Sequence, residues 1–351
     1  MHELIKKSAR DVVALLARGE VSPLELIDLA EARIAETDGA LNALPTRCFD
    51  RARARAKALP RQKAGTAPPG YLHGLPIAIK DLTDVEGVRT TYGSPIYANH
   101  VPARSDALVQ MLEAKGAVVI AKSNTPEFGA GAQTFNEVFG TTKNPWNTLR
   151  TPGGSSGGAA VALAAGQVWL ATGSDLGGSL RPPASFCSVV GLRPSTGRVA
   201  HGPAVLPFAT LSVEGPMARN VGDVALLLDA QAGQHPIDPI SLPAPAEPFI
   251  ASVERPTPPK RVAFSADLKL GPVAAEVREI CSRAAASFAS LGAEVVEDCI
   301  DFGPAEFVFQ TLRGAQFAAG RAPLLESDRD KLKPEVIWNI EHGLTLTADQ
   351  I

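Results

Sequence analysis

The chain has 351 residues and a formal net charge of −3, with 45% hydrophobic and 20% charged residues. This balance supplies enough apolar side chains for a sizeable core and argues against intrinsic disorder. It lacks the basic excess typical of nucleic-acid-binding proteins, so we expect no nucleic-acid partner. The four cysteines are far apart and form no C-x-x-C pair, which predicts free thiols in a reducing compartment.

No segment has the pattern of a membrane anchor or a signal peptide. The charged N-terminus is not followed by an apolar region. The most apolar stretch, residues 158–171, contains Gln167 and is shorter than the about 20 residues that cross a bilayer. We therefore expect a cytoplasmic protein that does not bind membranes.

Residues 1–60 are expected to form a helical lead. Ser8 is placed to cap a helix that Gly19 ends. Ser22 opens a second helix, because proline follows it and Glu25 stands where a capping box requires it. A connector rich in proline, lysine and glycine follows at residues 57–70.

From residue 72 onward, segments with strand character alternate with segments with helix character. The expected strands are residues 75–79, 117–121, 168–172, 189–192, 261–264 and 293–296. The expected helices are residues 106–115, capped by Ser105 and ended by Gly116, and residues 157–165 and 274–291. This alternation predicts an α/β fold with a mixed central sheet that helices cover on both faces.

We predict a single domain over residues 1–351. After the helical lead it comprises a core at residues 72–233, a proline-rich surface excursion at residues 234–260, and a further α/β part at residues 261–351. Residues 347–350 have the pattern of a capping box that begins a helix. Because the sequence ends one turn later, we expect the C-terminal part to be truncated.

Two glycine-rich segments carry serines that are candidates for catalysis. They are residues 153–158, which contain Ser155, and residues 173–179, which end at Ser179. Glycine permits strained backbone and close approach of a substrate to the main chain. Consecutive backbone N–H groups in such turns can bind an oxyanion. The residues after Ser179 can begin a helix, which favours Ser179 as a nucleophile at an anion-binding turn.

A serine nucleophile needs a base to accept its proton. None of the six histidines stands in a sequence context that pairs it with an acidic residue. A lysine can replace histidine when burial keeps it neutral. Lys80 follows the apolar strand at residues 75–79 and is the candidate base. The alternative is a strand-end lysine that extends to solvent.

These residues together resemble the amidase signature family. The resemblance is densest over residues 153–194, includes the strand at residues 74–81, and extends from about Ser8 to the end of the chain. It implies a triad in which Ser179 attacks the amide carbonyl, Ser155 relays the proton and Lys80 is the base. It also implies a cis peptide bond between Gly154 and Ser155.

The resemblance assigns further roles around the triad. The oxyanion hole would be formed by main-chain N–H groups of Leu176, Gly177, Gly178 and Ser179. Asp175 and Arg181 flank this turn, and we interpret them as an internal salt bridge rather than substrate contacts. Ser156 is interpreted as a structural neighbour of the relay serine. Cys187 is interpreted as a core thiol.

The implied activity is hydrolysis of a linear carboxylic amide to an acid and an amine or ammonia through an acyl-serine intermediate. The substrate would be a small molecule, with no metal or organic cofactor. Because family members are often homodimers, the resemblance also implies a homodimer. Two alternatives remain open: the glutaminase subunit of a glutamine-dependent tRNA amidotransferase, and a catalytically incomplete amidase fragment.

Two other interpretations of the glycine-rich segments fit less well. The sequence around Ser155 matches the G-x-S-x-G elbow of α/β-hydrolases, but a loop precedes it where that motif requires a strand. A phosphate-binding loop would end in Gly-Lys-Ser or Gly-Lys-Thr, which residues 157–160 lack.

Overall fold

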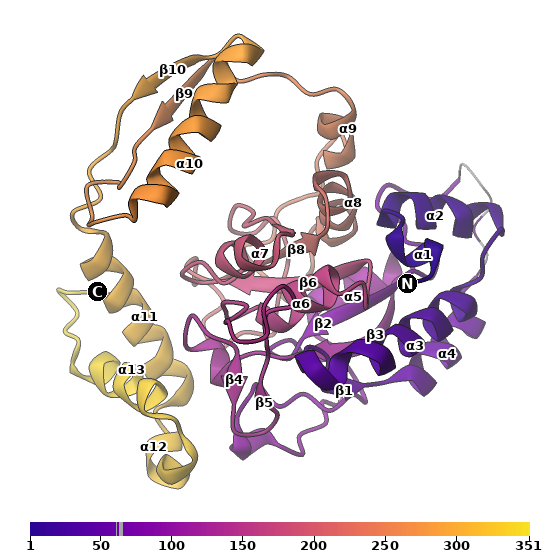
Figure 1. Cartoon of the computed structure of the whole chain (residues 1–351). Coiled ribbons are helices and arrows are strands. Elements are labelled where there is room, and N and C mark those ends of the chain that lie inside the picture. Colours follow the sequence, from indigo (N-terminus) through magenta and orange to yellow (C-terminus); the bar gives the residue numbers. More distant parts are fainter. Residues whose placement is uncertain (61, 63–65) are drawn as a thin grey trace.

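The structure is a computed structural model that describes residues 1–60, 62 and 66–351 (Figure 1). Part of the expected connector at residues 57–70 therefore lies outside the described residues.

The N-terminal region is helical, as expected. It contains α1 (Glu3–Lys6), α2 (Ala9–Arg18), α3 (Pro23–Leu41) and α4 (Phe49–Ala58). The Ser8 side chain accepts the Asp11 N–H at the start of α2, and Gly19 ends this helix with a φ of 72°. Ser22 and Glu25 form the predicted capping box of α3.

A six-stranded mixed sheet forms the centre of the molecule, in the order β1-β3-β2-β6-β8-β7. The strands are β1 (Thr46–Arg47), β2 (Pro76–Lys80), β3 (Val118–Ser123), β6 (Leu170–Asp175), β7 (Val190–Gly191) and β8 (Val213–Ala218). β3, β2 and β6 are parallel, whereas the pairings of β1, β8 and β7 are antiparallel. Every residue of β2, β3 and β6 is buried, which requires cover on both faces of the sheet. The predicted mixed α/β fold is confirmed.

Four helices surround this sheet: α6, α7 and α8 contact its strands, and α5 packs against α8. They are α5 (Ala107–Ala114), α6 (Gly157–Ala164), α7 (Arg181–Cys187) and α8 (Val221–Gln231). The small residues of α6 let this helix contact four strands, β2, β3, β6 and β8. Short elements beside the sheet are η1 (Pro95–Tyr97), η2 (Glu127–Gly129), and the pair β4 (Phe135–Asn136) and β5 (Gly140–Thr141).

Three expectations differ in detail. Asp106, not Ser105, caps α5, because its side chain accepts the Leu108 N–H while the Ser105 hydroxyl accepts the Glu86 N–H. β6 begins at Leu170, two residues later than expected. β8 was not predicted, because its sequence contains Gly215 and Pro216, which normally interrupt strands.

The C-terminal third extends from the central sheet (Figure 1). In it, β9 (Arg261–Phe264) and β10 (Glu294–Glu297) form a separate parallel pair. Its helices are α9 (Phe249–Glu254), α10 (Ala275–Ala286), η3 (Ser287–Leu291), α11 (Ala305–Arg321), α12 (Leu324–Ser327), η4 (Arg329–Lys331) and α13 (Pro334–Thr345). α11 and α13 pack together. Phe317 of α11 belongs to a buried cluster that also contains Phe128 and Ala130.

The expected capping-box bonds form between Thr347 and Gln350.

Candidate active site

Lys80 lies at the end of β2 with no exposed surface. Its Nζ is 2.7 Å from Ser155 Oγ, 2.9 Å from Ser156 Oγ and 2.9 Å from Ser174 Oγ. The alternative that this lysine reaches solvent is wrong. Burial lowers the pKa of Lys80 to about 7, although two carboxyl groups, Glu214 and Asp175, oppose this shift. A lysine in these surroundings is neutral in a large fraction of molecules at physiological pH.

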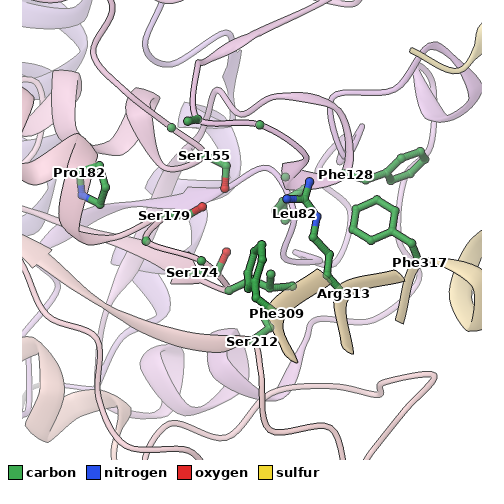
Figure 2. A pocket seen from close by; sticks show the side chains of 17 residues that line it. Leu82, Phe128, Ser155, Ser174, Ser179, Pro182, Ser212, Phe309, Arg313 and Phe317 are labelled. Atoms are coloured by element: carbon green, nitrogen blue, oxygen red, sulfur yellow. The ribbon is translucent and has the colours of Figure 1, made fainter. Parts of the chain in front are cut away.

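Ser155 stands immediately before α6, and its peptide bond to Gly154 is cis, as the resemblance implied. The Ser156 N–H donates to the Ser179 carbonyl at 3.2 Å and so joins the two glycine-rich segments. Figure 2 shows the side chains of Ser155 and Ser179 at the same pocket. Within the described residues, no hydrogen bond joins their two hydroxyl groups.

Asp175 organises the turn between β6 and α7. It is fully buried and accepts hydrogen bonds from the Gly178 N–H at 2.7 Å and the Leu180 N–H at 3.2 Å. Arg181 and Arg193 form ion pairs with it at 3.0 and 3.1 Å. Burial by itself raises the Asp175 pKa, but the hydrogen bonds of Arg181, Gly178 and Leu180 hold it below the ordinary value. The expected internal salt bridge is present, and Arg193 is an additional partner.

The expected oxyanion hole needs one correction. The Gly178 N–H is already donated to Asp175, so this group does not point freely into the pocket. Within the described residues, the N–H groups of Leu176, Gly177 and Ser179 have no acceptor. These three groups are the available anion donors of the turn.

A pocket of about 280 Å³ lies over the serines. Part of its lining is the turn at residues 176–179, and another part comes from α11. The lining residues are Leu82, Phe128, Gly129, Gly131, Ala132, Gly154, Ser155, Ser174, Leu176, Gly177, Gly178, Ser179, Pro182, Ser212, Phe309, Arg313 and Phe317.

Sequence reasoning missed the wall that α11 provides. Phe309, Arg313 and Phe317 are spaced four residues apart and therefore lie on one helix face, a pattern that the sequence contains. Ser174 was also missed as a partner of Lys80. Its place on β6 depends on a strand boundary that only the structure gives.

Arg313 brings a positive charge to the pocket. Figure 2 shows it extending from α11 between Phe309 and Phe317. Its guanidinium carbon lies 5.7 Å and 5.6 Å from the centres of these two rings. Burial lowers its pKa. No carboxylate of the described residues forms an ion pair with Arg313, and its Nε has no hydrogen-bond partner.

The remaining candidates have structural surroundings. Cys187 is buried, burial raises its pKa to about 12, and all four cysteines are free, as expected. Ser156 accepts hydrogen bonds from Lys80 and from the Ser174 N–H. One histidine has an acidic neighbour that its sequence context did not indicate: His201 Nδ1 lies 3.7 Å from Asp238, although this nitrogen has no hydrogen-bond partner among the described residues. Neither residue lines the pocket.

Metal-binding clusters and membrane-spanning helices are both missing from the described part of the chain. It contains no group of three or more His, Cys, Asp and Glu side chains placed to hold a metal ion. None of its helices combines the length and apolar character needed to cross a membrane.

Comparison with models of protein families shows to which family the chain belongs. The family model described as Amidase matches residues 25–340. The chain belongs to the amidase family. Curated relatives of this chain include a glutamyl-tRNA(Gln) amidotransferase subunit from Anaeromyxobacter dehalogenans, 40% identical over 295 residues. The corresponding subunit from Thermus thermophilus is 44% identical over 257 residues.

These alignments cover 84% and 72% of this chain, but only 60% and 52% of the respective relatives. The chain thus spans about three fifths of the length of the first relative. Solved structures cover it more fully. A bacterial aryl acylamidase of the amidase signature family superposes with a TM-score of 0.88 at 28% identity, over 98% of this chain and 74% of that one. A substrate complex of 6-aminohexanoate cyclic dimer hydrolase gives 0.87 at 28% identity, over 99% and 73%.

Proposed function

We propose that this amidase-family chain hydrolyses a linear carboxylic amide through an acyl intermediate on Ser179. The observation that carries the proposal is the buried Lys80, whose Nζ lies 2.7 Å from Ser155 Oγ at the pocket that Ser179 also lines. A lysine without access to water can be neutral and act as a base, whereas a solvated lysine at neutral pH cannot.

The residues support the following sequence of steps. Neutral Lys80 accepts a proton from Ser155, which takes the Ser179 proton as Ser179 Oγ attacks the substrate carbonyl carbon. The N–H groups of Leu176, Gly177 and Ser179 stabilise the resulting oxyanion. The relay then returns the proton to the leaving nitrogen, and the C–N bond breaks. Water, activated by the same relay, releases the acid and regenerates Ser179.

The relay requires a hydrogen bond between the Ser179 and Ser155 hydroxyls that the structure lacks. Catalytic hydrogen bonds often shorten only when substrate binds. We expect substrate to close this bond by confining the Ser179 side chain.

Labelling with a fluorophosphonate tests this mechanism without knowledge of the substrate. The reagent needs an activated serine and an oxyanion site, so we expect a single adduct on Ser179, mapped by peptide mass spectrometry. Ser179→Ala and Lys80→Ala should abolish the adduct and all amide turnover while far-UV circular dichroism stays unchanged. A hydrolytically active Ser179→Ala protein would refute the mechanism.

Arg313 favours a substrate with a negatively charged group. Its guanidinium lines the pocket without a carboxylate partner among the described residues, and a buried charge is stabilised when a ligand neutralises it. Glutamine carries such a carboxylate, and the curated relatives are named amidotransferase subunits. Glutaminase activity within an amidotransferase is therefore the second candidate function.

Paired substrates test the charge preference. Glutamine or the monoamide of glutaric acid should have a higher kcat/KM than a neutral aliphatic amide of similar length. Arg313→Met should reduce the ratio of the two kcat/KM values by at least about tenfold, because it removes the charge and keeps an apolar side chain. An unchanged ratio in Arg313→Met would exclude this role.

A further inference from the structure

Glu214 is a partly buried acidic residue that the triad mechanism does not use. It lies in β8 directly opposite Ser174 of β6. Residues that face each other in an antiparallel pair project from the same side of the sheet. Ser174 Oγ contacts Lys80 Nζ, and Ser212, two residues before Glu214, lines the same pocket as Ser174. The Glu214 side chain therefore shares the sheet face on which Lys80 meets its serine partners.

The Glu214 carboxyl group lacks a partner of its own. Its Oε2 is inaccessible to solvent and has no hydrogen bond within the described residues. Burial, together with the nearby Asp106, raises its pKa to about 8, and Lys80 opposes the shift. Among the described residues, Lys80 is the one cation whose charge acts on Glu214.

The other charged groups around this pair are already engaged. Asp175, which also acts on Lys80, is bound by Arg181 and Arg193. Asp106 accepts hydrogen bonds from the N–H groups of Leu108 and Gly202. The charges of His201 and Asp84 also affect its pKa. The buried pair of Lys122 and Asp81 lies 3.5 Å apart beside the same strand end.

We propose that Glu214 is a positioning residue that stabilises the ammonium form of Lys80 during proton transfer. When Lys80 takes the proton that leaves Ser179, a positive charge forms in a buried site. A carboxylate beside that charge lowers its free energy, as the aspartate does for the histidine of a Ser-His-Asp triad. This role rests on the proposed function, because it concerns the same proton relay.

The pH dependence of Ser179 labelling tests the role. Glu214→Gln keeps the shape of the side chain but never carries a charge. At about pH 6, where the wild-type carboxyl is protonated, the labelling rate of Glu214→Gln should be within about twofold of the wild-type rate. At about pH 9, it should be about tenfold lower than the wild-type rate. Glu214→Asp retains an ionisable carboxyl and should keep the wild-type pH dependence. A purely structural role would give a ratio of wild-type to Glu214→Gln labelling rates that does not change with pH.

The outcomes separate this inference from the proposed function. If wild type shows no labelling of Ser179 at any pH, the proposed function fails. If wild type is labelled and the ratio of its labelling rate to that of Glu214→Gln stays constant from about pH 6 to about pH 9, the role of Glu214 is refuted. Should Glu214→Gln fail to fold, Glu214→Met gives the same comparison, because it is uncharged, similar in length and needs no hydrogen-bond partner.

Discussion

At the scale of single residues, the Lys80 amine is costly to charge because it is buried, yet all of its hydrogen bonds have partners. Its amine has three serine hydroxyls as neighbours and no surface exposed to solvent. Burial disfavours its charged form, while the hydroxyls provide partners for either protonation state. This arrangement keeps a normally cationic side chain available as a base.

The rate of Ser179 labelling should therefore rise as pH increases through about 7. In the proposed mechanism the neutral form of Lys80 is the reactive form. Its pKa is lowered to about 7, so the neutral fraction grows over this range. Second-order rate constants for fluorophosphonate labelling, corrected for reagent hydrolysis at each pH, give the profile. A rate that stays flat through this range would show that Lys80 is not the base.

At the scale of secondary-structure elements, the turn from β6 to α7 depends on Asp175. This carboxylate binds the N–H groups of Gly178 and Leu180, and it forms ion pairs with Arg181 at the start of α7 and with Arg193 after β7. The residues of this turn, 176–179, line the pocket.

Asp175→Asn should lower the free energy of unfolding by about 3 kcal/mol, because it leaves buried donors without a charged acceptor. Ser179 labelling should fall in parallel. Arg181→Ala is the matched control: the Arg181 side chain is 57% exposed and Arg193 remains, so its effect should be much smaller. Urea unfolding measures both. Equal losses in the two variants would contradict the central role of Asp175.

The contact of α6 with the loop after β3 depends on the absence of a side chain at Gly158. A Cβ there would lie 2.4 Å from Asn124 N and 2.7 Å from Ala43 O, both main-chain atoms. Gly158→Ala should destabilise the protein by about 3 kcal/mol, since the backbone must move. Gly39 in α3 has no neighbour within 4 Å, so Gly39→Ala should instead stabilise it by about 1 kcal/mol. Thermal unfolding of both variants tests the contrast, and a stabilised Gly158→Ala would refute it.

At the scale of the whole molecule, Glu214 links global stability to pH. Its pKa is 4.5 in the unfolded chain and about 8 in the folded one. Between these values the folded state keeps a proton that the unfolded state has released, so this group destabilises the protein as pH rises.

Wild type should therefore lose stability relative to Glu214→Gln from about pH 5 to about pH 8. Urea unfolding of both proteins at several pH values measures the difference, and the comparison cancels the titration of groups on which Glu214 does not act. A difference that is independent of pH would show that Glu214 has an ordinary pKa in the folded protein.

The features that the sequence predicted well are those encoded by local patterns. The cap at Ser8, the capping box of Ser22 and Glu25, and the strand that ends at Lys80 all depend on neighbouring residues. Ser105 was a wrong choice of cap because two adjacent side chains could serve, and packing of the Glu86 loop decided between them. β8 was missed because pairing with β6 overrides the local effect of glycine and proline.

The sequence by itself determined the family resemblance, the mixed α/β class and the three residues proposed as the triad, because these lie in dense local motifs. Only the tertiary structure decided that Lys80 is fully buried against Ser155 and Ser174 and that Gly178 donates to Asp175. It also decided that Arg313 enters the pocket from a helix more than a hundred residues away in sequence. The physical reason is that burial and charge pairing arise between segments distant in the chain, and no local pattern specifies which of them meet.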